Sequence, residues 1–270
     1  MIRIENTVVS GMEAAIRGMR NAKNSWDKAD SKSGYASEDF LSELIDRHVC
    51  DLMEHMGAAD EVVAECYETL AQFYHENAVL NKDSETGIVN YFLMGGKDFD
   101  LATNLSKAGT DHGKYLRQIQ ISVDITAPLF WWKEFDTYKV GTVANSTSTM
   151  HTITNSPITM ENFSFEVLFP GPQAQEAMCD MITIVQICEQ LRKKYLKAKE
   201  KGDDRLATNY WRLLIELLPN GWLQKRTVTL NYAVAKNIYN ARHAHKLTEW
   251  HKVCKWISEL PYAQQLILNK

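Results

Sequence analysis

Two asparagines and an arginine recur at short spacing in the last third of this 270-residue chain. Asn231 and Asn237 are six residues apart, and Arg242 follows five residues after Asn237. An Asn amide carries both a donor and an acceptor, so it can form hydrogen bonds with the polar edge of a heterocycle. An Arg guanidinium can hold an oxyanion through two parallel hydrogen bonds. The pattern favours a site for an anionic heterocyclic ligand, and the alternative is a solvated helix face whose Asn side chains cap the helix.

A second polar segment, residues 126–149, mixes aromatic, charged and hydroxyl side chains and ends in Thr147-Ser148-Thr149. Such a loop offers hydroxyl and backbone N–H donors to an anion, and aromatic side chains nearby can stack on a flat ring. The same composition is typical of an aromatic core segment followed by a polar turn. The residues alone leave both interpretations open.

No familiar nucleotide or metal motif is complete in the sequence. Residues 109–114 resemble a phosphate-binding loop, but only three residues separate Gly109 from Gly113, and Tyr115 stands where Ser or Thr must reach magnesium. No G-x-G-x-x-G follows a predicted strand, so a Rossmann site has no support. The five cysteines form no C-x-x-C pair, and no zinc-ligand spacing is found. We therefore expect no metal site.

The overall composition excludes several classes of protein. The formal net charge is −4, whereas a protein that wraps nucleic acid carries a strong basic excess. Hydrophobic residues make up 45% of the chain and charged residues 24%, which is typical of a globular domain. The apolar stretches are far shorter than the roughly 20 residues of a membrane-spanning helix, and the first residues lack the apolar core of a signal peptide. We expect a cytoplasmic protein that binds neither a membrane nor a nucleic-acid polymer.

Hydrophobic periodicity predicts a helical hairpin in the N-terminal third. Apolar residues at three-four spacing predict one helix over residues 37–56 and a second helix that begins at Asp60. A short turn joins the two helices. We interpret residues 1–97 as a helical N-terminal part and residues 98–270 as the core, and we expect one compact domain because no flexible linker separates them.

The core is predicted to combine strands with helices, which makes the chain an α+β protein. Alternating apolar and polar residues from 119 to 125 predict a half-buried strand that ends at Pro128. A long helix is predicted after Pro172, and another helix over residues 204–218.

Together, the two polar segments resemble the flavin-dependent thymidylate synthase family. The family has the motif Pro-x-Phe-x-x-x-Gln-x-x-Arg-His-Arg-x-x-Ser, followed by a Ser-Gly-Arg loop. In this chain, Pro128 and Phe130 match the first two residues, residues 133–135 lie around the Gln position, and residues 137–139 occupy the Arg-His-Arg positions. Thr142 stands at the Ser position, and residues 147–149 at the loop. The family's C-terminal motif has an Asn twelve residues after a Leu-Pro pair, then an Asn six and an Arg eleven residues after that Asn. This spacing is met by Pro219, Asn231, Asn237 and Arg242. The resemblance covers residues 105–260.

The resemblance implies a central sheet flanked by helices, to which the N-terminal helical hairpin is added. It also implies a homotetramer with FAD bound between subunits, and reductive methylation at C5 of deoxyuridylate (dUMP). Methylene-tetrahydrofolate would supply the carbon, and NADPH the reducing equivalents. By position, the flavin site would include Thr137, Tyr138, Lys139, Asn231 and Asn237. The nucleotide site would include Thr147, Ser148, Thr149, Lys225 and Arg242, with Arg242 as the catalytic residue.

The chain departs from the family signature at its charged positions. Thr137-Tyr138-Lys139 stands where the family has Arg-His-Arg, and Thr149 stands where the phosphate loop has Arg. Lys139 and Lys225 keep a point charge but not the planar fork of an Arg. Two alternatives to a flavin enzyme therefore stay open: a non-catalytic nucleotide-binding member of the family that has lost FAD, and an unrelated helical interaction protein.

Overall fold

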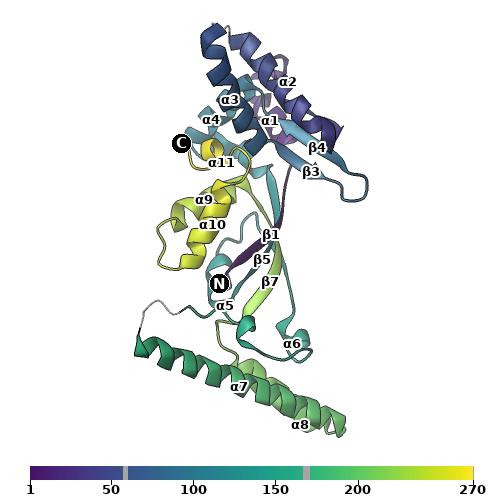
Figure 1. The fold of residues 1–270 in the computed structure, drawn as a ribbon, viewed down its shortest axis with the longest axis vertical. Coiled ribbons are helices and arrows are strands. Elements are labelled where there is room, and N and C mark those ends of the chain that lie inside the picture. Colours follow the sequence, from purple (N-terminus) through teal and green to yellow (C-terminus); the bar gives the residue numbers. More distant parts are fainter. Residues whose placement is uncertain (57–59, 167–170, 270) are drawn as a thin grey trace. The chain divides into compact units, whose positions relative to one another are not determined.

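The computed structural model describes residues 1–56, 60–166 and 171–269. The chain forms two compact units, and helices flank the sheets in an α+β fold, as predicted (Figure 1). Unit 1 comprises Met1–Glu5, Asp124–Lys139 and Ala144–Val228. Unit 2 comprises Asn6–Val123, Val140–Val143 and Thr229–Lys270. The turn predicted between the two N-terminal helices falls on residues 57–59, which lie outside the described residues.

A four-stranded sheet has the strand order β1-β5-β7-β6. Its strands are β1 (Arg3–Ser10), β5 (Gln120–Pro128), β6 (Val143–Ser146) and β7 (Leu223–Asn231). In β5, Ile121, Val123 and Ile125 are at most 1% exposed, and the polar residues between them are partly exposed. The half-buried strand predicted here is confirmed. It ends at Pro128, as a residue without a backbone N–H cannot donate to the ladder.

Unit 2 contains a three-stranded antiparallel sheet that the hydrophobic pattern does not predict. Its strands, β2 (Lys32–Ser37), β4 (Ile88–Leu93) and β3 (Val79–Lys82), pair in the order β2-β4-β3. β2 carries mostly polar and small side chains, and its Tyr35 is 76% exposed. A strand of this kind shows no alternation of apolar residues, which is the signal that sequence analysis depends on. β1 is missed for the same reason, because Val9 is its one buried residue.

The predicted N-terminal helices are present in unit 2 as α2 (Glu38–Met56) and α3 (Asp60–Asn77). The other helices of this unit are α1 (Met12–Met19), α4 (Gly96–Lys107), α9 (Tyr232–Arg242), α10 (Thr248–Ser258) and α11 (Ala263–Leu266). Short 3₁₀-helices are η1 (Asn21–Lys23), η2 (Trp26–Lys28) and η3 (Gly113–Arg117). No helix in the described part of the chain is long and apolar enough to cross a membrane.

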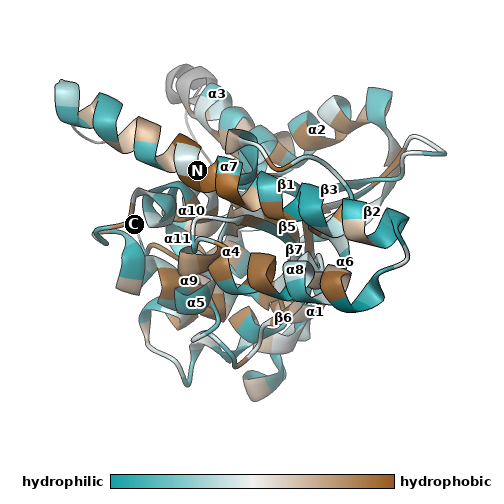
Figure 2. Ribbon diagram, turned by 90° about the horizontal axis from the view of Figure 1, so that it is seen from below, coloured by the Kyte–Doolittle hydropathy of each residue, from teal (hydrophilic) through white to brown (hydrophobic). Residues whose placement is uncertain are grey.

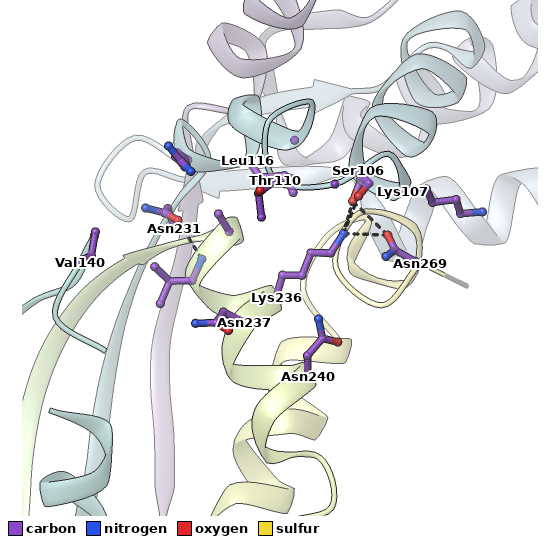
Figure 3. Close-up of a pocket in the computed structure, with 16 residues that line it drawn as sticks. Ser106, Lys107, Thr110, Leu116, Val140, Asn231, Lys236, Asn237, Asn240 and Asn269 are labelled. Atoms are coloured by element: carbon purple, nitrogen blue, oxygen red, sulfur yellow. Dashed lines mark hydrogen bonds between the residues drawn. The ribbon is translucent and has the colours of Figure 1, made fainter. Parts of the chain in front are cut away.

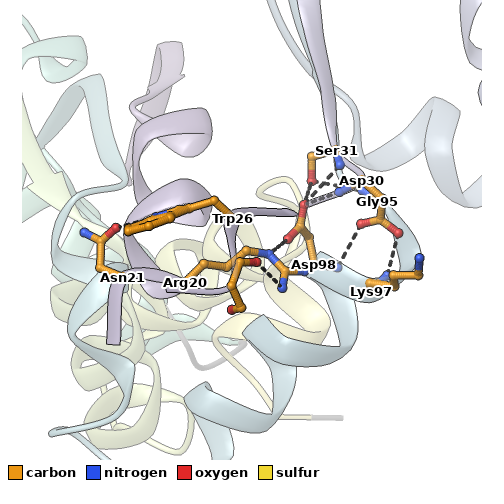
Figure 4. A network of polar contacts seen from close by, with 9 residues as sticks. Arg20, Asn21, Trp26, Asp30, Ser31, Gly95, Lys97 and Asp98 are labelled. Carbon is orange, nitrogen blue, oxygen red and sulfur yellow. Dashed lines mark hydrogen bonds and ion pairs between the residues drawn. The ribbon is translucent and has the colours of Figure 1, made fainter. Parts of the chain in front are cut away.

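A buried polar network fixes the start of α4 (Figure 4). The Asp30 carboxylate accepts hydrogen bonds from the backbone N–H groups of Lys97 at 2.9 Å and Asp98 at 3.0 Å, in the first turn of the helix. The Asp98 carboxylate in turn accepts from Arg20 Nε at 2.6 Å and from the Ser31 N–H at 3.0 Å. Arg20 is 4% exposed and Asp98 is fully buried, so the two charges compensate each other away from water. This reciprocal capping sets the direction of α4.

Unit 1 is built on a helical hairpin and a short aromatic helix. Its helices are α5 (Leu129–Phe135), α6 (Thr149–Thr152), α7 (Pro172–Glu200) and α8 (Asp204–Leu217), with the 3₁₀-helix η4 (Met160–Asn162). The long helices predicted after Pro172 and over 204–218 are confirmed. In α5, Trp131 and Trp132 are at most 1% exposed. The aromatic part of residues 126–149 is therefore a core segment, which agrees with the interpretation of these residues as an aromatic core segment followed by a polar turn.

Helices α7 and α8 also present apolar side chains to solvent. Leu206, Leu213 and Leu217 are 40%, 40% and 52% exposed, and their spacing places them on one face of α8. On α7, Ile182 and Ile187 are 41% and 46% exposed. Figure 2 shows apolar segments along both helices on the side toward the viewer. Exposed apolar side chains that gather on one face of a helix, as the leucines of α8 do, are typical of a protein–protein interface.

Candidate functional site

A pocket of about 730 Å³ is lined entirely by residues of unit 2 (Figure 3). Ligand pockets in proteins span about 300–1,000 Å³, so the volume suits a nucleotide-sized ligand. The wall combines the end of α4, the segment that leads into η3, residues 140–141, the start of α9 and the C-terminal tail.

The pocket wall is rich in amides and cations. Its polar side chains are the amides of Asn231, Asn237, Asn240 and Asn269, the hydroxyls of Ser106 and Thr110, and the cations of Lys107, Arg117 and Lys236. None of the described lining residues is an Asp or a Glu. Within the described part of the chain, Lys107 and Arg117 have no ion-pair partner. The resulting positive potential and the amide donors suit an anionic ligand that carries a polar heterocycle.

Asn231 is held in place by the start of α9. Its side-chain oxygen accepts a hydrogen bond from the Val234 N–H at 3.1 Å, which caps the helix. An added Cβ at Gly141 would lie 2.7 Å from Asn231 Nδ2, and Gly141 has a φ of +80°, so glycine is required there. Because the Asn231 oxygen caps the helix, its NH₂ group is the part that can donate to a ligand.

Lys236 extends from α9 across the pocket to the end of α4 and the C-terminal tail (Figure 3). Its Nζ donates to Ser106 O at 2.9 Å, to Ser106 Oγ at 2.6 Å and to Asn269 Oδ1 at 3.0 Å. Burial lowers the pKa of Lys236, because desolvation disfavours the charged form. The three acceptors are neutral, so they satisfy the hydrogen bonds of the ammonium group without compensating its charge.

Two residues that the resemblance assigns to the nucleotide, Thr147 and Lys225, lie side by side in unit 1. The Thr147 backbone N–H donates to the Lys225 carbonyl at 2.9 Å, and Thr147 Oγ1 donates to the same oxygen at 3.2 Å. Ser148 is the residue before α6, and its Oγ lies 2.6 Å from His151 Nδ1. Thr149 is the first residue of α6.

The cations of β7 are paired inside unit 1. Lys225 Nζ lies 2.9 Å from Asp124 Oδ2, and this hydrogen bond raises the pKa of Lys225. The neighbouring Arg226 donates to Asp136 Oδ1 at 2.7 Å, and its guanidinium carbon lies 4.2 Å from the centre of the Trp132 ring. An anionic ligand that uses these cations must compete with two carboxylates.

The predicted flavin triplet follows α5 in unit 1. Thr137 Oγ1 donates to the Glu134 carbonyl at 2.7 Å, and the Tyr138 ring lies 6.3 Å from the Phe135 ring. Lys139 is exposed, and it has no ion-pair partner among the described residues. Lys139 is therefore the member of the triplet whose charge is available to a ligand.

Arg242 is the last residue of α9 in unit 2. Its side chain is half-buried, and its guanidinium carbon lies 4.8 Å from the centre of the ring of Trp250, a fully buried residue of α10. A guanidinium stacked on an aromatic face keeps its N–H groups directed outward along the ring plane.

The structure places the predicted site residues in two sets. Asn231, Asn237 and Arg242 belong to unit 2, and the two asparagines line the same pocket. The triplet 137–139, the loop 147–149 and Lys225 belong to unit 1, where the loop contacts the strand that carries Lys225.

Several pocket residues are absent from the sequence prediction, notably Ser106, Lys236 and Asn269. Gly109 and Gly113, noted for their resemblance to a phosphate-binding loop, do line the pocket. They follow helix α4 rather than a strand, so the geometry of a true phosphate-binding loop is absent. Lys236 adjoins the predicted Asn237 and could have been found from its place on α9, but no spacing indicates Asn269.

No protein-family model matches the sequence, and no curated protein sequence is similar to it. Among solved structures, the chain is similar to flavin-dependent thymidylate synthase ThyX from Helicobacter pylori with FAD and dUMP. Two such structures match at 14% identity over 89% of this chain and 98% of the other, with TM-scores of 0.45 and 0.48. The chain is also similar to the UMP/dUMP methylase PolB from Streptomyces cacaoi bound with 5-Br UMP, at 13% identity over 65% of this chain and 83% of the other, with a TM-score of 0.45. The first two belong to the family that the sequence motifs resemble.

Proposed function

We propose that this chain is a flavin-dependent enzyme that transfers a one-carbon group to C5 of a uracil nucleotide, dUMP. In this reaction methylene-tetrahydrofolate supplies the carbon and NADPH the reducing equivalents. One observation carries the proposal: Asn231 and Asn237, both in the C-terminal motif, line one pocket whose described wall has three cations and no carboxylate. That combination suits a flat heterocycle that carries phosphate groups.

The pocket fits the FAD that the resemblance implies. Asn237 offers a donor and an acceptor, and Asn231 offers its NH₂ group, to the polar edge of a ring system. Leu116, Val140 and Val234 add apolar surface on which a ring can pack. When bound, the flavin supplies the hydride that reduces the transferred one-carbon group.

We assign the nucleotide to Arg242, Lys225 and the loop 147–149, with Arg242 as the catalytic residue. Arg242 has the directional N–H groups needed to hold a uracil oxygen or a phosphate while the ring reacts. The loop adds the hydroxyls of Thr147, Ser148 and Thr149. We place Thr137, Tyr138 and Lys139 beside the flavin, where Lys139 contributes the positive charge.

We also propose that the chain assembles as a homotetramer. The exposed leucines of α8 and the exposed isoleucines of α7 provide apolar surface for contacts between copies.

A second candidate function is nucleotide binding without catalysis, in a member of the family that has lost FAD. One observation favours it: in the triplet that the resemblance places beside the flavin, Thr137 and Tyr138 stand where the family has a charged Arg and a His, so Lys139 is the one cation left there. Fewer cations in the triplet weaken the attraction for the phosphates of FAD.

The absorption spectrum of the purified protein distinguishes the two candidates. The enzyme should carry a flavin band, or acquire one after incubation with FAD and removal of the excess. A colourless protein that binds dUMP but retains no FAD would favour the second candidate. A protein that binds neither ligand would contradict both.

A further inference from the structure

Lys236 is the most enclosed cation of the pocket. It spans from α9 to Ser106 at the end of α4 and to Asn269 near the C-terminus, and all of its N–H groups are used (Figure 3). Its acceptors are one carbonyl, one hydroxyl and one amide oxygen, which are neutral groups. A partly buried ammonium is stabilised by a nearby carboxylate or another anion, because water screens its charge less than at the surface.

No carboxylate of the described pocket wall compensates this charge. Lys107 and Arg117 line the same pocket and add positive charge rather than removing it. Among the described residues, the positive charge of the pocket wall is therefore not compensated, although the hydrogen bonds of Lys236 are complete. Within the described part of the chain, Lys236 has no ion-pair partner, and in this it differs from Lys225, which is paired with Asp124.

The contact to Asn269 shows how an anion can reach Lys236. Ser106 Oγ donates to the Leu266 carbonyl at 2.7 Å and is 3% exposed, so it is fixed in the core. Asn269 also lines the pocket, but it is exposed and lies three residues beyond the end of α11, and its Oδ1 accepts from Ser106 Oγ at 3.1 Å as well as from Lys236. A phosphate oxygen can replace the neutral amide oxygen of Asn269 and form a stronger, charge-assisted hydrogen bond.

We propose that Lys236 binds a phosphate group of the nucleotide ligand and so supplies a cation that the altered signature 137–139 lacks. The assignment rests on the proposed function for the presence of a nucleotide, but it does not depend on which nucleotide enters the pocket. The phosphate can belong to FAD or to dUMP, and the ligand pairs below separate these sources.

Calorimetric titration with matched ligand pairs tests the assignment. The pairs are ADP with adenosine, FMN with riboflavin, and dUMP with deoxyuridine, and the ratio of affinities within a pair measures the phosphate contribution; FAD itself is titrated separately. In the wild type, at least one phosphorylated ligand should bind more tightly than its partner. Lys236→Met should reduce that ratio about 10- to 150-fold, the range for one lost charge-assisted hydrogen bond. Lys236→Arg should retain part of it.

Two further variants keep the test decisive. Lys97→Met removes an exposed lysine at the other end of α4, so it makes the same change of charge and should leave the ratio unchanged. Asn269→Asp places a carboxylate beside Lys236 without changing the size of the side chain. This variant should abolish the phosphate preference while keeping or raising the melting temperature. It replaces Lys236→Met as the test if Lys236→Met fails to fold.

The outcomes separate this assignment from the flavin function. A phosphate preference for ADP or FMN that Lys236→Met or Asn269→Asp removes indicates that Lys236 binds a phosphate of FAD, and one confined to dUMP identifies the uracil nucleotide. Either result supports the assignment, including in a protein that proves to bind no flavin. FAD binding that is insensitive to both variants would leave the flavin function intact and overturn the role of Lys236. No phosphate preference in any pair would also overturn it.

Discussion

Lys225 Nζ lies 2.9 Å from the Asp124 carboxylate, so the cation that the family resemblance assigns to the nucleotide already has an anionic partner within the chain. The side chains of Lys225 and Asp124 are 43% and 17% exposed. An ion pair that is this accessible to water is weak, so a ligand phosphate can compete for the ammonium group. The pair therefore limits nucleotide affinity without excluding binding.

Asp124→Asn is expected to raise the affinity for dUMP by up to about fivefold, because an exposed ion pair contributes about 0.2–1 kcal/mol. The amide oxygen of the variant can still accept the hydrogen bond that Thr227 Oγ1 donates at 2.6 Å. Calorimetric titration measures the change, and deoxyuridine, which lacks the phosphate, should bind equally to both proteins. Unchanged dUMP affinity would remove Lys225 from the phosphate site.

Arg242→Ala is expected to weaken dUMP binding about 10- to 150-fold, since a charge-assisted hydrogen bond contributes about 1.5–3 kcal/mol. Arg242→Lys should recover only part of the loss, because an ammonium group cannot reproduce the guanidinium fork. The contact of Arg242 with the Trp250 ring makes thermal melting a necessary parallel measurement. If both variants melt earlier but bind dUMP as the wild type does, Arg242 is structural.

Gly95→Ala is expected to destabilise the fold by about 1–3 kcal/mol, because overpacking forces the neighbouring backbone to move. The new Cβ would lie 2.2 Å from Asp30 Oδ1 and 2.4 Å from the Asp30 backbone carbon. Gly96→Ala is the matched control, as its Cβ would meet its nearest described neighbour, Leu52, at 3.7 Å, an ordinary contact. Denaturant unfolding compares the two.

The Gly95 variant also tests whether the capping network positions the pocket. Since α4 carries Ser106 and Lys107 to the pocket wall, Gly95→Ala should weaken ligand binding as well as stability. Equal unfolding free energies for the two glycine variants would show that the Asp30 network does not fix α4.

The sequence predicts elements whose apolar pattern is strong and misses those whose pattern is weak. β5 is recognised because Ile121, Val123 and Ile125 alternate with polar residues, whereas β2 offers no such contrast because its Tyr35 points to solvent. For the site, the sequence spacing predicts both Asn231, at the end of β7, and Asn237, in α9. The partners of Lys236 lie 130 residues before it and 33 residues after it, a proximity that only the tertiary fold creates.

Leu213→Glu is expected to reduce the assembly state of the protein, because a charge on the exposed leucine face of α8 cannot be buried between copies. Light scattering should show a homotetramer for the wild type and a smaller species for the variant. Thr208→Glu, on another face of α8, provides the control and should not alter the mass. A monomeric wild type at micromolar concentration would contradict the proposed assembly.

The most direct test of the proposed reaction is the mass of the nucleotide after incubation with the protein. The protein is mixed with FAD, NADPH, methylene-tetrahydrofolate and dUMP, and the nucleotide is analysed by mass spectrometry. We expect a product that is heavier than dUMP by one methyl group in place of hydrogen, or by a related one-carbon group, and that is absent when FAD or the folate is omitted. Recovery of unchanged dUMP from a protein that demonstrably binds both FAD and dUMP would contradict the proposed reaction.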